Sequence, residues 1–223
     1  MNYHDVLKTI SETPISILDA SIPISKYQPI DLSSSNVELD EIDITNPVEC
    51  QSYIDLVLSR KNGFVAYGGY LEKRSLYANT DRFSEGEPRN IHLGMDFWCA
   101  AGTKVVMPLN GVVHSFKNNS DFGNYGPTII IQHQIQQTTY YSLYGHLSLE
   151  SLDDLYIGKQ FHKGEILATL GQTAINVNYT PHLHFQLILD IKDYQGDYPG
   201  VCSQADLNFY KNNCPAPNLL LGL

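Results

Sequence analysis

From Gly63 onward, the chain is a succession of short segments rich in β-branched and aromatic residues, separated by Gly, Pro and Asn. These segments cover residues 64–70, 103–108, 111–116, 128–132, 138–143, 160–161, 166–170 and 183–189. Strands this short, with turn signals between them, are typical of a β-sandwich or barrel. The sequence therefore predicts a mainly β fold, a sandwich or barrel, with few short helices.

Two stretches of this β-rich region share a local pattern. Residues 101–113 and residues 157–167 each read as a β-run, a glycine turn and a second β-run. The similarity is too short for an internal repeat. It indicates two hairpins that lie against each other.

Helical signals are sparse. Residues 51–58 carry an apolar face at helical spacing, and residues 149–155 are a second brief candidate. The stretch after Tyr194 contains three prolines and several asparagines, so we expect it to be a loop packed on the surface.

The charge of −10 is concentrated at the start of the chain. Residues 1–60 hold ten acidic and three basic residues, whereas residues 61–223 hold fourteen and eleven. We therefore divide the chain into an acidic N-terminal leader, residues 1–62, which wraps or covers the core, and a body, residues 63–223, with a loop-rich tail. The acidic balance argues against nucleic acid as a partner, because binding nucleic acid requires a dense basic patch.

Targeting signals are not visible in the sequence. No apolar run approaches the roughly 18 residues of a membrane helix, and residues 1–10 lack the pattern of a secretory signal. As written, the chain is expected to be cytoplasmic and without a membrane span. A signal missing from this sequence would instead indicate a periplasmic or extracellular protein. The four cysteines form no CxxC pair and are expected to be reduced thiols, with Cys202 and Cys214 the first pair to test in an exported protein.

The strongest chemical signal is a pair of histidine motifs. His92 and Asp96 are four residues apart, and His182 and His184 are two apart in a β-prone run. Side chains at i and i+2 of a strand point to the same face, so His182 and His184 should project together while Leu183 and Phe185 face the core. Two imidazoles and one carboxylate suit Zn²⁺ with an open fourth position, as in a catalytic site.

A third β-edge histidine completes the constellation. His146 directly follows a β-run, so it should lie at a strand end. His92, Asp96 and one of His182 and His184 would supply three ligands, which leaves two histidines for proton transfer and oxyanion stabilisation. A single buried histidine is usually a core residue, but this co-occurrence favours a site. The other histidines have no partner motif and are interpreted as surface or incidental: His4, His114, His133 and His162.

These phrases resemble the lysostaphin/LytM-type zinc metalloendopeptidases of peptidoglycan, which share HxxxD, a Y-x-H-L phrase and P-H-L-H-F in this order. The resemblance covers about residues 63–190, and all five diagnostic polar positions are present. It implies an antiparallel β-sheet groove with one zinc ion per chain at its floor. It also implies that the substrate is a peptide cross-link of peptidoglycan.

The resemblance assigns roles to the five residues. His92, Asp96 and His184 would be the zinc ligands. His146 and His182 would be the catalytic pair, with His182 the better candidate for the general base.

The sequence departs from the family pattern at several places. Many members carry a tyrosine shortly before the first ligand, but here Phe83 lies in that stretch and Tyr77 is further upstream, so that role is left unassigned. Gln186 replaces a frequent glutamate, a change expected to touch no ligand. Residues 176–179 differ from the small-residue loop that is common there and could alter the groove wall.

Three functions fit these observations to different degrees. The first is a zinc-dependent endopeptidase, in which the acidic leader could act as an inhibitory latch. The second is a non-catalytic zinc-binding or regulatory module on the same fold, although such relatives typically lose zinc ligands and this chain keeps all of them. The third is a carrier-type β-sandwich with a phosphoryl group on His92, which leaves Asp96 and the histidine pair unexplained. The sequence does not predict the bond that is cleaved or the oligomeric state.

Overall fold

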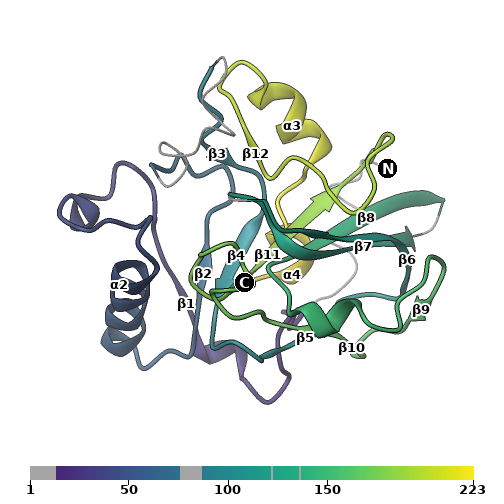
Figure 1. Ribbon diagram of the computed structural model, residues 1–223, viewed down its shortest axis with the longest axis horizontal. Helices are drawn as coiled ribbons and strands as arrows, with labels where there is room; N and C mark the ends of the chain where they lie inside the picture. Colours follow the sequence, from purple (N-terminus) through teal and green to yellow (C-terminus); the bar gives the residue numbers. More distant parts are fainter. Residues whose placement is uncertain (1–13, 76–86, 122, 136) are drawn as a thin grey trace.

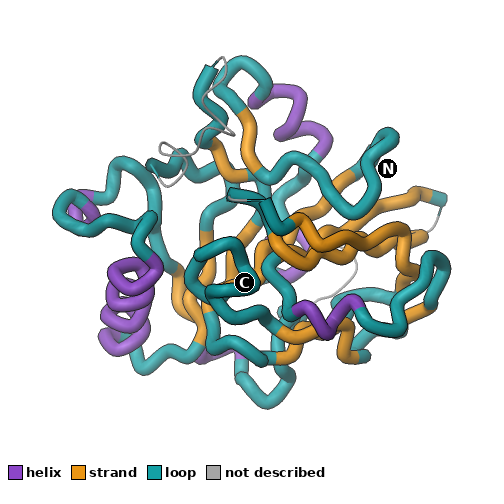
Figure 2. Tube along the Cα trace, in the orientation of Figure 1, coloured by secondary structure: helices purple, strands orange, loops and turns teal. Residues whose placement is uncertain are grey.

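A single large sheet dominates the computed structural model, which describes residues 14–75, 87–121, 123–135 and 137–223 (Figure 1). Its eight strands follow the spatial order β1 (Tyr27–Pro29), β2 (Val65–Gly68), β4 (Met95–Trp98), β11 (His182–Ile188), β8 (Thr138–Gly145), β7 (Gly126–Ile135), β6 (Gly111–Asn119) and β9 (Gln160–Phe161). β1 and β2 are parallel, and the other neighbouring strands are antiparallel. Strands fill the middle of the molecule, with α2 and α3 at its edges (Figure 2). The predicted mainly β fold is confirmed.

Two small sheets join segments that are distant in sequence. β5 (Lys104–Val106) pairs with β10 (Ile166–Thr169), and β3 (Ile91–His92) pairs with β12 (Val201–Cys202). Since β6 also pairs with β9, the two similar stretches 101–113 and 157–167 contact each other at both of their β-runs. The two stretches lie against each other as expected, but neither is a hairpin, because β5 and β10 belong to one sheet and β6 and β9 to another.

The pairing of β11 brings the sequence motifs together. His184 lies opposite Asp96 on β4 and opposite Gly145 on β8, and His182 lies opposite Trp98. The two motifs are therefore neighbours in the interior of the sheet. β11 is hydrogen-bonded to β4 on one side and to β8 on the other.

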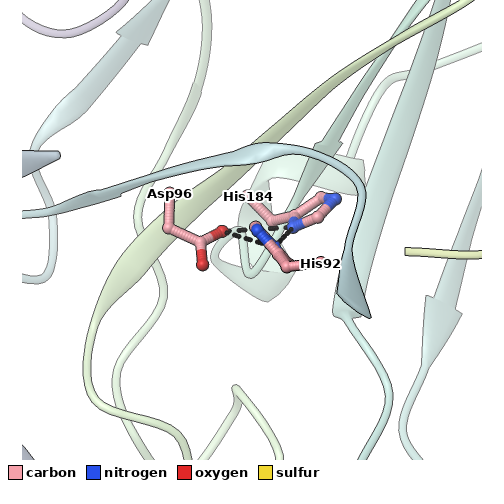
Figure 3. Close-up of side chains that lie close together, drawn as sticks. All are labelled: His92, Asp96 and His184. Atoms are coloured by element: carbon pink, nitrogen blue, oxygen red, sulfur yellow. Dashed lines mark hydrogen bonds and ion pairs between the residues drawn. The ribbon is translucent and has the colours of Figure 1, made fainter. Parts of the chain in front are cut away.

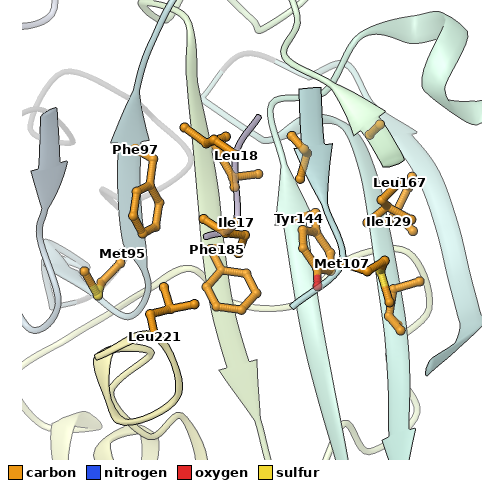
Figure 4. Close-up of a cluster of buried hydrophobic side chains, with 14 of the residues drawn as sticks. Ile17, Leu18, Met95, Phe97, Met107, Ile129, Tyr144, Leu167, Phe185 and Leu221 are labelled. Atoms are coloured by element: carbon orange, nitrogen blue, oxygen red, sulfur yellow. The ribbon is translucent and has the colours of Figure 1, made fainter. Parts of the chain in front are cut away.

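The main hydrophobic core covers the other face of the same strands. Phe97, Tyr144 and Phe185 come from three neighbouring strands and are fully buried (Figure 4). Leu183 is buried in the same cluster, as the alternation along β11 predicts. Ile17 and Leu18, from the N-terminal segment, are part of this core as well.

The N-terminal segment adds a strand and a helix beside the sheet. After the 3-10 turns Ile24–Lys26 and Val37–Leu39, helix α2 runs over Pro47–Arg60. Asn46 caps the helix by accepting a hydrogen bond from the Val48 amide, and proline occupies the first turn, where no amide proton is needed. The helix predicted at residues 51–58 is confirmed and begins four residues earlier.

A second apolar cluster joins this helix to the sheet. Its members come from the segment after β1, from α2, and from β2 and β4: Ile30, Leu32, Cys50, Tyr53, Ile54, Ala66 and Trp98. The N-terminal segment therefore shares its buried surface with the strand that carries Asp96.

The C-terminal stretch is not the surface loop that we expected. It forms β12 and the helices α3 (Leu207–Asn213) and α4 (Asn218–Leu221). Leu221 is fully buried in the main core, and its carbonyl accepts a hydrogen bond from the Ile15 amide. Proline and asparagine set the turns of this stretch, but apolar residues between the turns have surface to bury, and that burial determines its place.

The short elements and the cysteines can be compared with the sequence as well. The candidate helix at residues 149–155 is a 3-10 turn over Leu149–Leu152. All four cysteines are free thiols. Within the part of the chain that the structure describes, no helix combines the length and apolar character needed to cross a membrane.

Candidate metal centre

Three side chains from three strands converge at one point. The Nε2 atom of His92 lies 2.9 Å from Nδ1 of His184 and 3.3 Å from Oδ1 of Asp96, and the latter two atoms are 3.1 Å apart (Figure 3). All three residues are buried. Two imidazole nitrogens and one carboxylate oxygen, aimed at a common point, form a donor set that suits a divalent transition metal.

A glycine makes this close approach possible. Gly94 lies between His92 on β3 and Asp96 on β4, against the neighbouring strand β11. A Cβ atom at this position would lie 2.7 Å from both Cε1 of His184 and the Phe185 carbonyl oxygen. Any other residue would push the connection away from β11, so glycine is required for the three ligands to meet.

Each histidine is fixed on its far side by a hydrogen bond. Nδ1 of His92 donates to the Gly69 carbonyl at 2.9 Å, and Nε2 of His184 donates to Oε1 of Gln186 at 2.9 Å. Because both acceptors are carbonyl oxygens, these nitrogens carry the protons. The unprotonated nitrogens, Nε2 of His92 and Nδ1 of His184, are the two that face Asp96, as a metal site requires.

The contact of Gln186 corrects an expectation from the sequence. Gln186 was expected to touch no ligand, yet it bonds directly to His184. Its amide nitrogen donates to the Pro199 carbonyl at 3.1 Å, which leaves the amide oxygen facing the histidine. The residue therefore fixes which nitrogen of His184 is available.

The carboxylate is charged although it is buried. Burial by itself raises the pKa of Asp96, but His92 and the Arg74 guanidinium hold that pKa well below its usual range. Oδ2 of Asp96 accepts a hydrogen bond from Nη1 of Arg74 at 2.6 Å, while Oδ1 faces the histidines. Burial lowers the pKa of His92 to about 4, despite the opposing effect of Asp96, so this histidine is neutral near pH 7.

His146 and His182 form a second pair beside the first three residues. Their ring centroids are 4.1 Å apart. His182 donates from Nδ1 to the Thr180 carbonyl at 2.6 Å, which leaves Nε2 as the proton-accepting nitrogen. His146 follows β8 with a φ of 62°, and its buried Nδ1 atom has no hydrogen-bond partner among the described residues. Burial is the largest cause of a lowered pKa in both residues, so both rings are neutral near pH 7.

All five predicted residues line one cavity of about 220 Å³. Part of its wall comes from the N-terminal segment, through Leu32, Ile44, Thr45, Pro47 and Cys50. Another part comes from residues 197–201 near the C-terminus. The cavity thus combines a polar floor with walls from both ends of the chain.

Several neighbours of the site were missed by sequence reasoning. Trp98 stacks on His182 with a centroid distance of 5.7 Å, and Tyr125 lies 5.0 Å from the His184 ring. Trp98 is two residues after Asp96 on one strand, so alternation could have found it. Arg74 lies in a stretch of mixed charges and gave no signal.

The remaining expectations are resolved in part. Tyr179 lines the cavity, so the unusual loop at residues 176–179 does contribute to the groove wall. His133 is buried rather than on the surface, bonded to the Asn110 carbonyl and the Ser142 hydroxyl. Tyr77 and Phe83 lie outside the described residues, as does His4.

Comparison with known proteins identifies a matching family model and one curated relative. Residues 90–195 match the model of peptidase family M23, a range that includes all five predicted site residues. A stretch of 95 residues, 43% of this chain, is 34% identical to an uncharacterized metalloprotease from Haemophilus influenzae and spans 18% of that relative's length. The chain therefore matches less than a fifth of this curated relative.

Similar solved structures include two catalytic domains. One is that of the prophage-encoded M23 protein EnpA from Enterococcus faecalis, with 22% identity and a TM-score of 0.38 over 50% of this chain and 78% of that one. The other is that of the antimicrobial peptidase lysostaphin from Staphylococcus simulans, with 19% identity and a TM-score of 0.36 over 55% of this chain and 80% of that one.

Proposed function

Residues 90–195 form a peptidase family M23 domain, and from this premise we propose that the chain is a zinc-dependent metalloendopeptidase. The relation to lysostaphin/LytM-type peptidases that the motifs predicted is confirmed. The metal, the catalytic roles and the substrate are our proposals. We propose that the substrate is a peptide cross-link of peptidoglycan.

The observation that carries the proposal is the orientation of the three donor atoms. His92, Asp96 and His184 direct Nε2, Oδ1 and Nδ1 toward one another, while the second polar atom of each side chain is held by a protein partner. Three fixed donors leave room for a fourth position, which is the arrangement of catalytic rather than structural zinc. The residues present therefore fit the metal.

Zinc held by these ligands would polarise a peptide carbonyl and lower the pKa of a water molecule toward about 7. His182 is suited to take the proton from that water, because its Nδ1–H is committed to the Thr180 carbonyl and its Nε2 is an acceptor. His146, whose ring centroid lies 4.1 Å from that of His182, is suited to stabilise the oxyanion by donating a hydrogen bond, and the proton that His182 takes from the water can then pass to the leaving amine. Trp98 holds the His182 ring from one face.

The test combines metal content with turnover of purified peptidoglycan and of synthetic cross-link peptides. The purified protein should hold about one zinc per chain. His184→Ala should lose both zinc and turnover, whereas His146→Ala should keep zinc and lose turnover. His162→Ala, at an exposed position, is the matched control and should behave like the wild-type protein.

The outcomes separate the candidate functions. A folded wild-type protein that binds no zinc contradicts the proposal. A protein that binds zinc through His184 but cleaves none of these substrates supports the alternative, a non-catalytic zinc-binding or regulatory module.

A further inference from the structure

The guanidinium of Arg74 is buried between two carboxylates beside the candidate metal centre. The side chain is 1% exposed. Its Nε atom lies 2.5 Å from Oε2 of Glu72, and its Nη1 atom lies 2.6 Å from Oδ2 of Asp96. One rigid fork therefore spans both acids, which a single ammonium group could not do in the same geometry.

The surroundings of this guanidinium are shaped to fit it. Its Cζ atom lies 5.5 Å from the centroid of the Trp98 ring. Gly69 has a φ of 99°, and a Cβ atom there would lie 2.0 Å from Nη2 of Arg74. The same glycine supplies the carbonyl that fixes His92. Gly69, with its positive φ, thus leaves space for the Arg74 guanidinium and also orients His92 through its carbonyl.

The segment that carries Arg74 also holds the strand of His92. The amide of Arg74 donates to the Asn90 carbonyl at 2.9 Å, and the amide of His92 donates to the Glu72 carbonyl at 2.9 Å. Residues 71–74 therefore fix His92 through a backbone hydrogen bond and Asp96 through the side chain of Arg74.

A further contact joins this segment to the N-terminal part of the chain. Oε1 of Glu72 accepts a hydrogen bond from the Leu32 amide at 3.0 Å, while Oε2 holds Arg74. A continuous path of hydrogen bonds runs from Leu32 through Glu72 and Arg74 to the carboxylate of Asp96.

From this arrangement we infer that Arg74 is a positioning residue for the metal centre. It holds Oδ2 of Asp96 so that Oδ1 alone faces His92 and His184, and the carboxylate would bind a metal through that one oxygen. The inference rests on the proposed zinc site, but it concerns metal binding and is independent of whether a peptide is cleaved.

The test measures zinc affinity by chelator competition and the visible absorption of the cobalt-substituted protein, with folding followed by circular dichroism. Arg74→Gln and Arg74→Lys should each lower zinc affinity by about 10- to 100-fold, the usual effect of losing an outer partner of a ligand. Both should change the cobalt spectrum, because Asp96 can then turn and use both oxygens. Arg60→Gln is the matched control, since Arg60 pairs with Glu38 on the exposed surface.

The outcomes distinguish this inference from the proposed function. A folded Arg74 variant with zinc affinity within twofold of wild type and an unchanged cobalt spectrum overturns the inference. If Arg74→Gln does not fold, Arg74→Lys decides by the same criteria, since it keeps the charge. If the wild-type protein binds zinc without cleaving peptidoglycan, the proposed function fails while the variants still decide the role of Arg74. If it binds no zinc, both fail.

Discussion

His184 donates its Nε2 proton to the side-chain oxygen of Gln186, two residues further along the same strand. This bond leaves Nδ1 as the nitrogen that faces Asp96 and His92. Without this bond, His184 could adopt either neutral tautomer, and in one of them the proton on Nδ1 would point at the metal position. Gln186 therefore decides the tautomer of a candidate ligand.

Replacing Gln186 by leucine removes this acceptor. We expect Gln186→Leu to lower zinc affinity by about 10- to 100-fold, since His184 loses the partner that selects its tautomer. Affinity is measured by chelator competition. Gln160→Leu, on the exposed edge strand β9, is the control and should leave the affinity unchanged. Equal affinities for the two variants would contradict the role of Gln186.

The contact of Gln186 was within reach of the sequence. The alternation that places His182 beside His184 places Gln186 next on the same face of β11. The residue types grouped His92 and Asp96 with one of the two histidines, but spacing alone could not choose between His182 and His184, because the contact joins residues that are 88 positions apart. The family resemblance supplied the choice of His184. To place Arg74 beside Asp96, one would need to know which residues meet at the site and also the course of residues 71–74. That segment has no periodic pattern, so residue spacing alone could not reveal the contact.

The two ends of the chain also differ in how much of their structure could be predicted from local sequence signals. Helix α2 was predicted because the apolar spacing of residues 51–58 is a local signal, although the start at Asn46 and Pro47 was not recognised. The burial of Leu221 was not predicted, because proline-rich composition signals turns but does not show which core the residues between those turns can reach. Local signals identified the elements, and tertiary packing determined where the C-terminal ones lie.

The buried position of Leu221 gives a prediction about stability. Leu221→Ala removes apolar atoms from the main core and should lower the free energy of unfolding by about 2–5 kcal/mol. Chemical denaturation measures the change. Leu56→Ala, on the exposed face of α2 at 46% exposure, is the control and should cost about 0.5 kcal/mol or less. If Leu221 lay in a surface loop instead, the two substitutions would lower the free energy of unfolding by similarly small amounts.

Thr180 connects the loop that precedes β11 to the N-terminal segment. Its hydroxyl donates to the Pro47 carbonyl at 3.0 Å, and its carbonyl accepts the proton of His182. Thr180→Val removes the hydroxyl and its bond to Pro47 but keeps the carbonyl that accepts from His182, which should cost about 1 kcal/mol of stability and reduce kcat several-fold with zinc content unchanged. Kinetics on a synthetic cross-link peptide and metal analysis measure both. Thr139→Val, whose hydroxyl bonds to Gln134 on the exposed surface, is the control. Unchanged kcat in Thr180→Val would argue against this connection.

His133 predicts how stability depends on pH. Burial lowers its pKa in the folded protein, with the bond to Asn110 opposing the shift in part. The unfolded chain, with a pKa of about 6.5, therefore takes up a proton at a higher pH than the folded protein does. The stability contributed by neutral His133 is present above about pH 6.5 and is lost as the pH falls below that value.

The measurement compares the free energy of unfolding of the wild-type protein and His133→Gln between pH 7.5 and about pH 5. The wild-type protein should lose more stability over this interval than the variant, because the variant has no titrating ring at this position. His162→Gln, at an exposed position, is the control and should follow the wild-type curve. Parallel curves for all three proteins would contradict the prediction.

The N-terminal segment, predicted from its charge as a separate leader, gives the last prediction. In the structure, Ile17 and Leu18 lie in the main core, β1 extends the large sheet, and Leu32 and Pro47 line the cavity. An inhibitory latch would raise turnover when removed. We expect the opposite: a chain that starts after residue 62 should lose several kcal/mol of stability and should not gain activity, because it loses core side chains and part of the cavity wall.

A cut in the chain tests this without removing the segment. Asn62 lies in an exposed turn after α2 with a φ of 51°, so a protease site inserted there should be accessible. After cleavage, the two fragments should remain associated on a sizing column, and turnover should stay within about twofold of that of the uncut protein. Cutting one peptide bond leaves the buried apolar contacts between the fragments in place. Release of the N-terminal fragment with a gain in turnover would establish the latch instead.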